Sequence, residues 1–220
     1  MEEIKEAENS LVDLGWAERI KKILYENSDP YSNVNLLPLD LQGYNSQSKA
    51  FDILLELKPK LIIEVGSWKG ASAIYMAKIL KNIGHTDFEI VCVDTWLGSV
   101  EHWFDRVSHD LFKIDIYQQF LSNVIHEGLT DIITPFRIDS VNAAEYFKTI
   151  EAVPDFVYID AGHDYLSVKH DLFLYSSLLK PGGHLVGDDW FHEPIKSAVY
   201  DTFEKNAIIE LGVDKYLWIK

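Results

Sequence analysis

The feature that most constrains the fold of this chain is a nine-residue turn between an apolar run and a helix-like run. The turn comprises residues 64–72, with the sequence EVGSWKGAS. Residues 61–63 before it are apolar, and residues 73–81 after it have the composition of a helix. A strand that turns on glycines into a helix is how open α/β sheets form a pocket for a nucleotide-like ligand. We therefore expect an α/β fold with a ligand site at this turn.

The two glycines of the turn differ from those of a dinucleotide-binding fingerprint. Gly66 permits a positive φ or a close approach of the ligand to bare backbone, and we expect Gly70 to let the helix begin close to the strand. A dinucleotide fingerprint carries a further glycine that admits the pyrophosphate. This chain has Ser67, Trp68 and Lys69 between its glycines, and a tryptophan is a poor neighbour for a pyrophosphate.

The remaining residues of the turn favour a zwitterionic ligand. The first turn of the helix offers unpaired N–H groups and a partial positive charge, which suit a carboxylate. Glu64 is negatively charged and suits an amino group better than a phosphate. S-adenosylmethionine has such an amino acid head, so the turn favours this cofactor. An ordinary glycine turn between a strand and a helix is the alternative that this stretch alone leaves open.

The composition predicts a globular protein of the cytoplasm without a nucleic-acid or membrane partner. The chain has 220 residues, of which 47% are hydrophobic, and a net charge of −15. Such a charge repels nucleic acid and anionic lipid. No apolar run has the length of a membrane span, and the acidic residues 1–6 lack the core of a signal peptide. Cys92 is the only cysteine, as expected of a reducing compartment.

Strand-like and helix-like segments alternate along most of the chain. This order predicts a mostly parallel sheet of seven strands with helices on both faces and one antiparallel strand near the C-terminus. Residues 1–45 are expected to form a helical N-terminal extension, with a loop over residues 29–46, and residues 46–220 the ligand-binding domain. The expected strands are residues 61–65, 89–93, 132–138, 156–159 and 184–186, followed by a hairpin of residues 207–211 and 215–219.

An acidic residue stands at the end of each of the first five expected strands. The ligand of an open α/β sheet lies beyond the carboxyl ends of its strands, so these acids are expected to converge. Their charges repel one another unless donors or cations offset them. The acids are Glu64, Asp94, Asp139, Asp160 and the pair Asp188 and Asp189.

Each acid has a chemical role that suits its position. Asp94 can accept both ribose hydroxyls of a nucleoside, and Asp139 or Ser140 can bond the adenine edge. Asp160, Asp188 and Asp189 together form an all-oxygen donor set that suits Mg²⁺. Asp189 can instead cap the following helix.

His163 is the candidate general base, because it follows Asp160 by three residues and a histidine exchanges protons near neutral pH. The alternative is that His163 caps or bonds backbone at the start of the next helix.

With these residues in hand, the chain resembles class I S-adenosylmethionine-dependent methyltransferases. It looks most like the metal-dependent O-methyltransferases typified by catechol, caffeoyl-CoA and macrolide-sugar O-methyltransferases. The resemblance covers roughly residues 46–220 and rests on Glu64, Gly66, Gly70 and Ser72, with a bulky residue at Trp68. It implies a Rossmann-like methyltransferase fold and a small-molecule acceptor.

The resemblance implies that Glu64, Gly66 and Ser72 hold the methionine part of the cofactor, that Asp94 holds the ribose and that the three aspartates bind a metal. The other site residues are expected from their positions at the strand ends. Catalysis is assigned to His163 and Asp160, and a magnesium or other divalent ion to Asp160, Asp188 and Asp189. The residues expected to bind S-adenosylmethionine are Glu64, Gly66, Ser67, Trp68, Gly70, Ser72, Asp94, Thr95, Trp96, Asp139, Ser140 and Asp160.

Two departures from the catechol-type pattern bear on the substrate. Those enzymes have Asp-Asn where this chain has Asp188 and Asp189, and a lysine base where it has His163. The histidine pattern is common in sugar- and polyketide-type relatives. We expect an acceptor with two adjacent oxygens, either a sugar diol or a catechol.

Other hypotheses stay open at this point. A nicotinamide-dependent oxidoreductase is disfavoured by Trp68 and the absent middle glycine, and a non-catalytic cofactor-binding module is the third candidate. The aromatic residues of segment 95–115, with Trp190 and Phe191, are compatible with a lid, a substrate wall or a homodimer contact.

Overall fold

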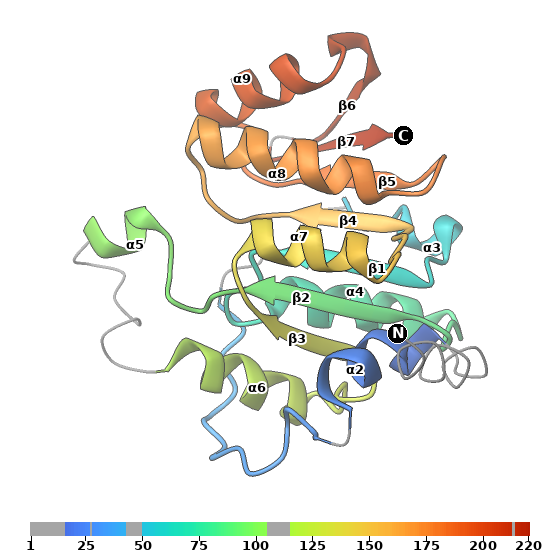
Figure 1. Ribbon diagram of the computed structural model, residues 1–220, viewed down its shortest axis with the longest axis vertical. Helices are drawn as coiled ribbons and strands as arrows, with labels where there is room; N and C mark the ends of the chain where they lie inside the picture. The colour runs from blue at the N-terminus through green and yellow to red at the C-terminus, as the bar shows by residue number, and fades with distance from the viewer. Residues whose placement is uncertain (1–15, 27, 43–49, 105–114, 213) are drawn as a thin grey trace.

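A seven-stranded sheet forms the centre of the molecule (Figure 1). The structure, a computed structural model, describes residues 16–26, 28–42, 50–104, 115–212 and 214–220. The strand order is β3-β2-β1-β4-β5-β7-β6. The strands are β1 Leu61–Val65, β2 Glu89–Asp94, β3 Ile133–Arg137, β4 Phe156–Ile159, β5 His184–Gly187, β6 Ile208–Leu211 and β7 Lys215–Ile219.

The strand directions confirm the predicted topology. Strand β1 pairs in parallel with β2 and β4, while β7 runs antiparallel to both β5 and β6. The order of the strands reverses between β1 and β4, so the crevice beyond their carboxyl ends is the expected place for a ligand.

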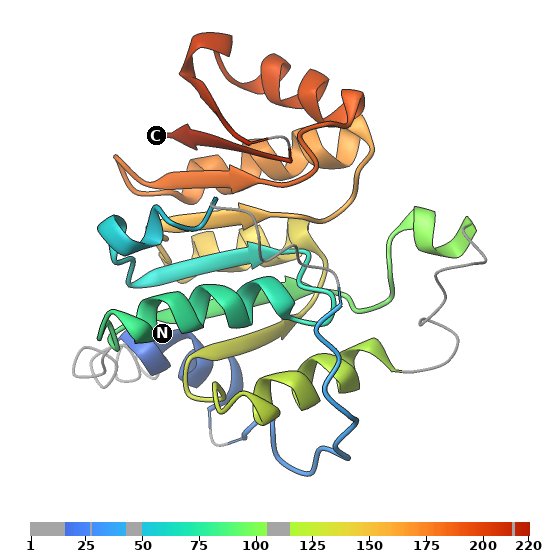
Figure 2. The ribbon, with the colours of Figure 1, turned by 180° about the vertical axis from the view of Figure 1, so that it is seen from behind.

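Helices cover both faces of the sheet. Figure 1 shows α7 and α8 in front of the strands, and Figure 2 shows α4 and α6 on the opposite face. The described helices are α2 Trp16–Tyr25, α3 Leu54–Leu57, α4 Ala71–Asn82, α5 Val100–Phe104, α6 Ile116–His126, α7 Ser140–Thr149, α8 Tyr165–Leu178 and α9 Glu193–Thr202, with a short 3₁₀ turn at Lys205–Ala207.

The apolar runs form central strands because both faces of each strand are buried. In β1, Leu61 and Ile63 pack into the cluster that contains Phe147 of α7. Ile62, between them, packs into the opposite cluster with Leu80 of α4. Successive side chains of a strand point to opposite faces, so a continuous apolar run fits a strand covered on both sides.

The described N-terminal part packs on the same sheet. Ile20 of α2 is 2% exposed and joins the cluster of β1 and α7. The buried Glu89 carboxylate accepts hydrogen bonds from the backbone N–H groups of Ile20 and Lys21, at 2.9 and 2.8 Å. The division at residue 45 stays a prediction. The described residues 28–42 are irregular, as expected. Within the described part of the chain, every helix is too short or too polar to cross a bilayer.

Candidate active site

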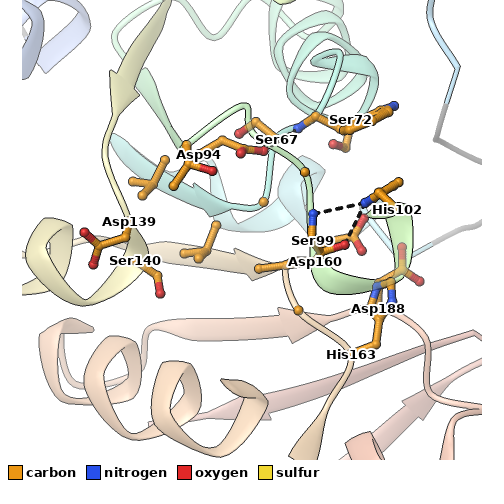
Figure 3. A pocket seen from close by; sticks show the side chains of 18 of the residues that line it. Ser67, Ser72, Asp94, Ser99, His102, Asp139, Ser140, Asp160, His163 and Asp188 are labelled. Carbon is orange, nitrogen blue, oxygen red and sulfur yellow. Dashed lines mark hydrogen bonds between the residues drawn. The ribbon is translucent and has the colours of Figure 1, made fainter. Parts of the chain in front are cut away.

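A cavity of about 510 Å³ lies at the carboxyl ends of β1, β2, β4 and β5 (Figure 3). It brings most of the predicted site residues together. Glu64, Gly70 and Trp96 do not line it. The predicted residues that do are Gly66, Ser67, Trp68, Ser72, Asp94, Thr95, Asp139, Ser140, Asp160, His163, Asp188 and Asp189.

Only a glycine fits at position 66, because the backbone at the end of β4 lies against it. Its φ is +88°, and a Cβ at this position would lie 2.0 Å from the carbonyl oxygen of Asp160. The backbone N–H of Asp160 donates to the carbonyl of Val65 at 2.8 Å. The glycine thus lets the end of β4 lie directly against the turn after β1, which places Asp160 beside the cavity.

Gly70 is constrained by a contact that the sequence did not predict. It has a φ of +84°, and a Cβ would lie 2.9 Å from the ring of Phe120. A close approach between the turn and α6 therefore requires a glycine here, and the expectation that Gly70 lets the helix begin close to the strand stays a prediction.

Glu64 lies beneath the turn and outside the cavity. Its fully buried carboxyl group accepts hydrogen bonds from the hydroxyl of Ser72 at 2.5 Å and from the thiol of Cys92 at 3.4 Å. Burial raises the pKa of Glu64 above its usual value. In this structure the residue fixes Ser72, which does line the cavity, and makes no direct approach to a ligand position.

Ser67 carries an orphaned polar atom at the cavity wall. The residue is 2% exposed, and its hydroxyl finds no hydrogen bond of good geometry within the described residues, although it lies near Glu64. Buried hydroxyl groups are normally hydrogen-bonded. A polar ligand in the cavity would supply the partner, so this atom fits a bound cofactor.

Asp94 organises the two tryptophans of the site. Its carboxylate accepts the backbone N–H groups of Trp68 at 2.8 Å and Trp96 at 2.7 Å. The indole N–H of Trp96 donates to the carbonyl of Trp68 at 2.7 Å, and the ring is 3% exposed. Trp96 thus supports the turn from below. Burial raises the pKa of Asp94, and each carboxylate oxygen keeps a lone pair for a hydroxyl of a ligand.

Asp139 and Ser140 form the far end of the cavity (Figure 3). Asp139 caps α7 by accepting the backbone N–H and the side-chain amide of Asn142, at 3.0 and 2.7 Å. These hydrogen bonds lower the pKa of Asp139. The Ser140 side chain is also engaged, by a hydrogen bond to the buried Asp171, so neither residue is singled out for an adenine contact.

At the opposite end, Asp160, His163 and Asp189 form a cluster. One candidate ligand atom from each lies within 4.8 Å of the others, and His163 Nε2 is 2.9 Å from Asp189 Oδ2. Neither His163 nor Asp189 is the N-cap of the helix that follows it. Asp164 caps α8, and His192 occupies the N-cap position of α9. His163 and Asp189 instead face each other.

The three residues differ in electrostatic environment. Burial, and then the charges of Asp188 and Asp189, raise the pKa of Asp160 well above its usual value. Burial alone would raise the pKa of Asp189, but the hydrogen bond and charge of His163 lower it below its usual value. Asp189 is therefore the carboxylate that stays ionised, and it holds the His163 ring in place.

Asp188, predicted as a third metal ligand, is held by protein donors in this structure. It accepts hydrogen bonds from the Tyr158 hydroxyl at 2.6 Å, the Lys215 ammonium at 2.9 Å and the Asp189 N–H at 2.8 Å. Lys215 is 2% exposed and also donates to Asp214 at 3.1 Å. The antiparallel strand β7 thus brings a cation to the acids at the sheet edge, and Asp188 is bound to that cation.

The donor chemistry of the cluster fits a divalent ion. Lys215 offsets the charge of Asp188, so the two carboxyl groups of the cluster, Asp160 and Asp189, remain as an excess of acid. Two carboxylates and an imidazole suit Mn²⁺ or Fe²⁺ as well as Mg²⁺, since imidazole favours metals of the first transition row.

Among the further residues that line the cavity, three have polar side chains that sequence reasoning missed: Gln42, Ser99 and His102. The His102 ring stacks on Trp68, with centroids 4.5 Å apart and an interplanar angle of 10°. Lys69 is fully buried and donates to Gln42 Oε1 at 2.7 Å, which fixes this residue over the turn. Gln42 and His102 come from segments outside the strand ends, and no motif in the sequence singled them out.

Comparisons with known proteins identify the family of this chain. Residues 63–190 match the family described as a methyltransferase domain. A rhamnosyl O-methyltransferase of Mycobacterium tuberculosis strain H37Rv is 29% identical over 138 residues, which are 63% of this chain and 49% of the relative. The same values hold for the enzyme of that name from Mycobacterium bovis. The chain therefore spans about half the length of the curated relatives it matches.

Solved structures share the fold over nearly the whole chain. The O-methyltransferase TomG of Streptomyces achromogenes, in complex with SAM, aligns with a TM-score of 0.58 and 15% identity over 96% of this chain and 89% of its own. The O-methyltransferase of Bacillus cereus in complex with SAH has a TM-score of 0.57 and 16% identity over 93% and 90%.

The family match includes the glycine turn and every strand-end acid. It spans more than half of the chain, and the fold agrees with it. The chain belongs to the methyltransferase domain family.

Proposed function

We propose that this protein is an S-adenosylmethionine-dependent O-methyltransferase that acts on a small-molecule hydroxyl group with a second oxygen beside it. The observation that carries the proposal is the single cavity that joins the glycine turn of β1 to the cluster of Asp160, His163 and Asp189. The family match favours this function over a nicotinamide-dependent oxidoreductase.

The cofactor would lie along the ends of β1 and β2. The first N–H groups of α4 suit the methionine carboxylate, and Asp94 suits the ribose. The Ser72 hydroxyl donates to Glu64, so it would act as an acceptor, as for the methionine amino group. Ser140 lies where the adenine edge would end. The unsatisfied Ser67 hydroxyl fits a polar ligand at the middle of this path.

His163 is assigned the general base. The ring lines the cavity; because Nε2 faces the ionised Asp189 carboxylate and donates to it, Nδ1 is the atom that would take the proton of an acceptor hydroxyl. The ionised Asp189 carboxylate at 2.9 Å would orient the ring and stabilise the imidazolium that forms. When bound, S-adenosylmethionine supplies an already activated methyl group, so orientation and proton removal are the parts left to the protein.

Asp160 and Asp189 are the carboxylates that would hold a divalent ion. When bound, such an ion supplies a positive charge that binds acceptor oxygens and lowers the pKa of a hydroxyl group. If His163 were a third ligand of the ion, its ring lone pair would be bound to the ion, and the ring could not also act as the general base. Mn²⁺ titration of His163→Ala separates these roles, because a base can be removed without loss of ion affinity.

A sugar hydroxyl is the favoured acceptor. The relative from Mycobacterium tuberculosis carries the name rhamnosyl O-methyltransferase, which supports a sugar diol over a catechol. The chain covers about half of that relative, so this part of the proposal depends on a direct assay.

The test is methyl transfer from S-adenosylmethionine to a panel of methyl glycosides and catechols, with Mg²⁺ or Mn²⁺, measured by S-adenosylhomocysteine release and product mass. His163→Ala should lose turnover. His170→Ala is the matched control, because His170 is exposed on α8 and does not line the cavity. Failure of the wild-type protein to bind S-adenosylhomocysteine would contradict the proposal.

Cytoplasmic location, homodimer formation and the lid role of residues 95–115 stay predictions. Within that segment Trp96 is buried and Trp103 is 57% exposed. Phe112 lies outside the described residues.

A further inference from the structure

His102 contacts two residues on one side of the cavity. Its Nδ1 atom lies 3.1 Å from the backbone nitrogen of Ser99 and 2.7 Å from the Ser99 hydroxyl. One ring face stacks on Trp68. Figure 3 shows His102 on the same side of the cavity as Ser72, away from Asp139 and Ser140.

The contact with Ser99 fixes the tautomer of His102. A backbone N–H can only donate, so Nδ1 must accept and carries no proton while this bond is made. The neutral ring then has its proton on Nε2 and is a donor at that atom. The arrangement corresponds to a capping box, with Ser99 directly before α5 and His102 at the third helical position. A histidine in this box keeps a donor that the usual glutamate would lack.

The cavity is short of groups that can bind an anion. Acids line it at Asp94, Asp139, Asp160, Asp188 and Asp189, and no Lys or Arg is among its described lining residues. The Lys69 ammonium is 2.7 Å from both Asp40 and Gln42. A ligand carboxylate must therefore be met by the start of α4, by hydroxyl groups and by the Nε2–H of His102.

The stacking on Trp68 places the Nε2–H donor of His102 beside the amino acid half of the expected ligand. Trp68 belongs to the turn that leads into α4, and Ser72 of the first turn of α4 also lines the cavity. The ring of His102 thus lies over the turn that would receive the amino acid part of the cofactor.

We propose that the Nε2–H of His102 donates a hydrogen bond to the methionine carboxylate of S-adenosylmethionine. The inference rests on the proposed function, because it requires that the cofactor occupies this cavity. It makes His102 a cofactor-binding residue supplied by α5, outside the turns that follow the sheet strands.

The test is calorimetric titration with S-adenosylhomocysteine and with 5′-methylthioadenosine, which keeps the thioether nucleoside but lacks the amino acid. His102→Gln keeps an acceptor for Ser99 and a donor for the carboxylate, whereas His102→Phe keeps only the stacking on Trp68. We expect about tenfold weaker binding of S-adenosylhomocysteine by the Phe variant, as for loss of a hydrogen bond to a charged group. The Gln variant should stay within about threefold of the wild type.

The thioether nucleoside separates this role from a structural one. Its affinity should be the same in the wild type and both variants. An equal loss for both ligands would reduce His102 to a capping residue, and unchanged binding of S-adenosylhomocysteine by His102→Phe would overturn the proposal. If that variant does not fold, His102→Leu gives the same comparison, because leucine is neutral and also lacks the donor. Absence of binding by the wild type would instead refute the proposed function itself.

Discussion

Replacement of Lys215 by methionine tests how the acids at the sheet edge are held together. The ammonium group is 2.9 Å from Asp188 and 3.1 Å from Asp214, and its side chain is 2% exposed. Burial would lower the pKa of Lys215, but the hydrogen bonds and charges of these two acids raise it above the usual value. Methionine would leave the Asp188 carboxylate without a cation, next to Asp160 and Asp189.

The expected loss follows from the burial of this pair. Removal of one partner of a buried ion pair destabilises a protein by about 3–5 kcal/mol. Asp188 keeps its hydrogen bonds from Tyr158 and from the N–H of Asp189, so we expect a value at the lower end, about 3 kcal/mol. For a chain of this size that loss lowers Tm by roughly 6–12 °C.

The assay is urea denaturation at pH 7 of Lys215→Met, Asp188→Asn and the double variant. The double variant should regain most of the loss, because the buried Asp188 charge is removed and only the partly exposed Asp214 stays without its cation. Lys180→Met is the matched control: Lys180 pairs with Asp155, its side chain is 43% exposed, and the expected loss is below about 1 kcal/mol. A loss below about 1 kcal/mol for Lys215→Met, or a double variant as unstable as the sum of the single ones, would refute the reasoning.

Three further predictions concern the turn, the N-terminal helix and the base. Gly66→Ala should destabilise the fold by about 2–4 kcal/mol and abolish S-adenosylhomocysteine binding, since the Cβ meets Asp160; an unchanged Tm and affinity would contradict this. Burial raises the pKa of Glu89 to about 7, so the stability it contributes is full below its unfolded pKa and falls as pH rises toward 7. Between pH 5 and pH 8 the free energy of unfolding, measured by urea denaturation, should fall by roughly 3 kcal/mol more in the wild type than in Glu89→Gln. The same pH dependence of stability in both proteins would exclude the mechanism. His163→Ala should lower kcat by about 10²- to 10⁴-fold and leave S-adenosylhomocysteine affinity unchanged; wild-type turnover would remove His163 as base.

The sheet could be predicted from the sequence because its signals are local. The run at residues 61–65 is apolar except for Glu64, and the structure gives β1 the same bounds. The hairpin of β6 and β7 followed from two short runs separated by Gly212 and its neighbours. The convergence of strand-end acids followed from a general rule for parallel sheets and needed no knowledge of side-chain contacts.

The parts that could not be predicted depend on tertiary contacts. Asp188 pairs with Lys215, which is remote in sequence and reaches it only because β7 lies beside β5. Gly70 is constrained by Phe120 of α6, and His102 reaches the cavity from a helix in the connection after β2. Periodicity and motif spacing carry no information about such pairs, so the roles of these residues required the structure.

The central claim is that one cavity at the strand ends holds both the cofactor and the reacting groups. A crystal structure with S-adenosylhomocysteine and Mn²⁺ tests it most directly. The account predicts the nucleoside along the Gly66 turn with its ribose at Asp94, and an anomalous manganese peak at Asp160 and Asp189 while Lys215 stays on Asp188. A cofactor bound elsewhere, or manganese bound at Asp188 with Lys215 displaced, would contradict it.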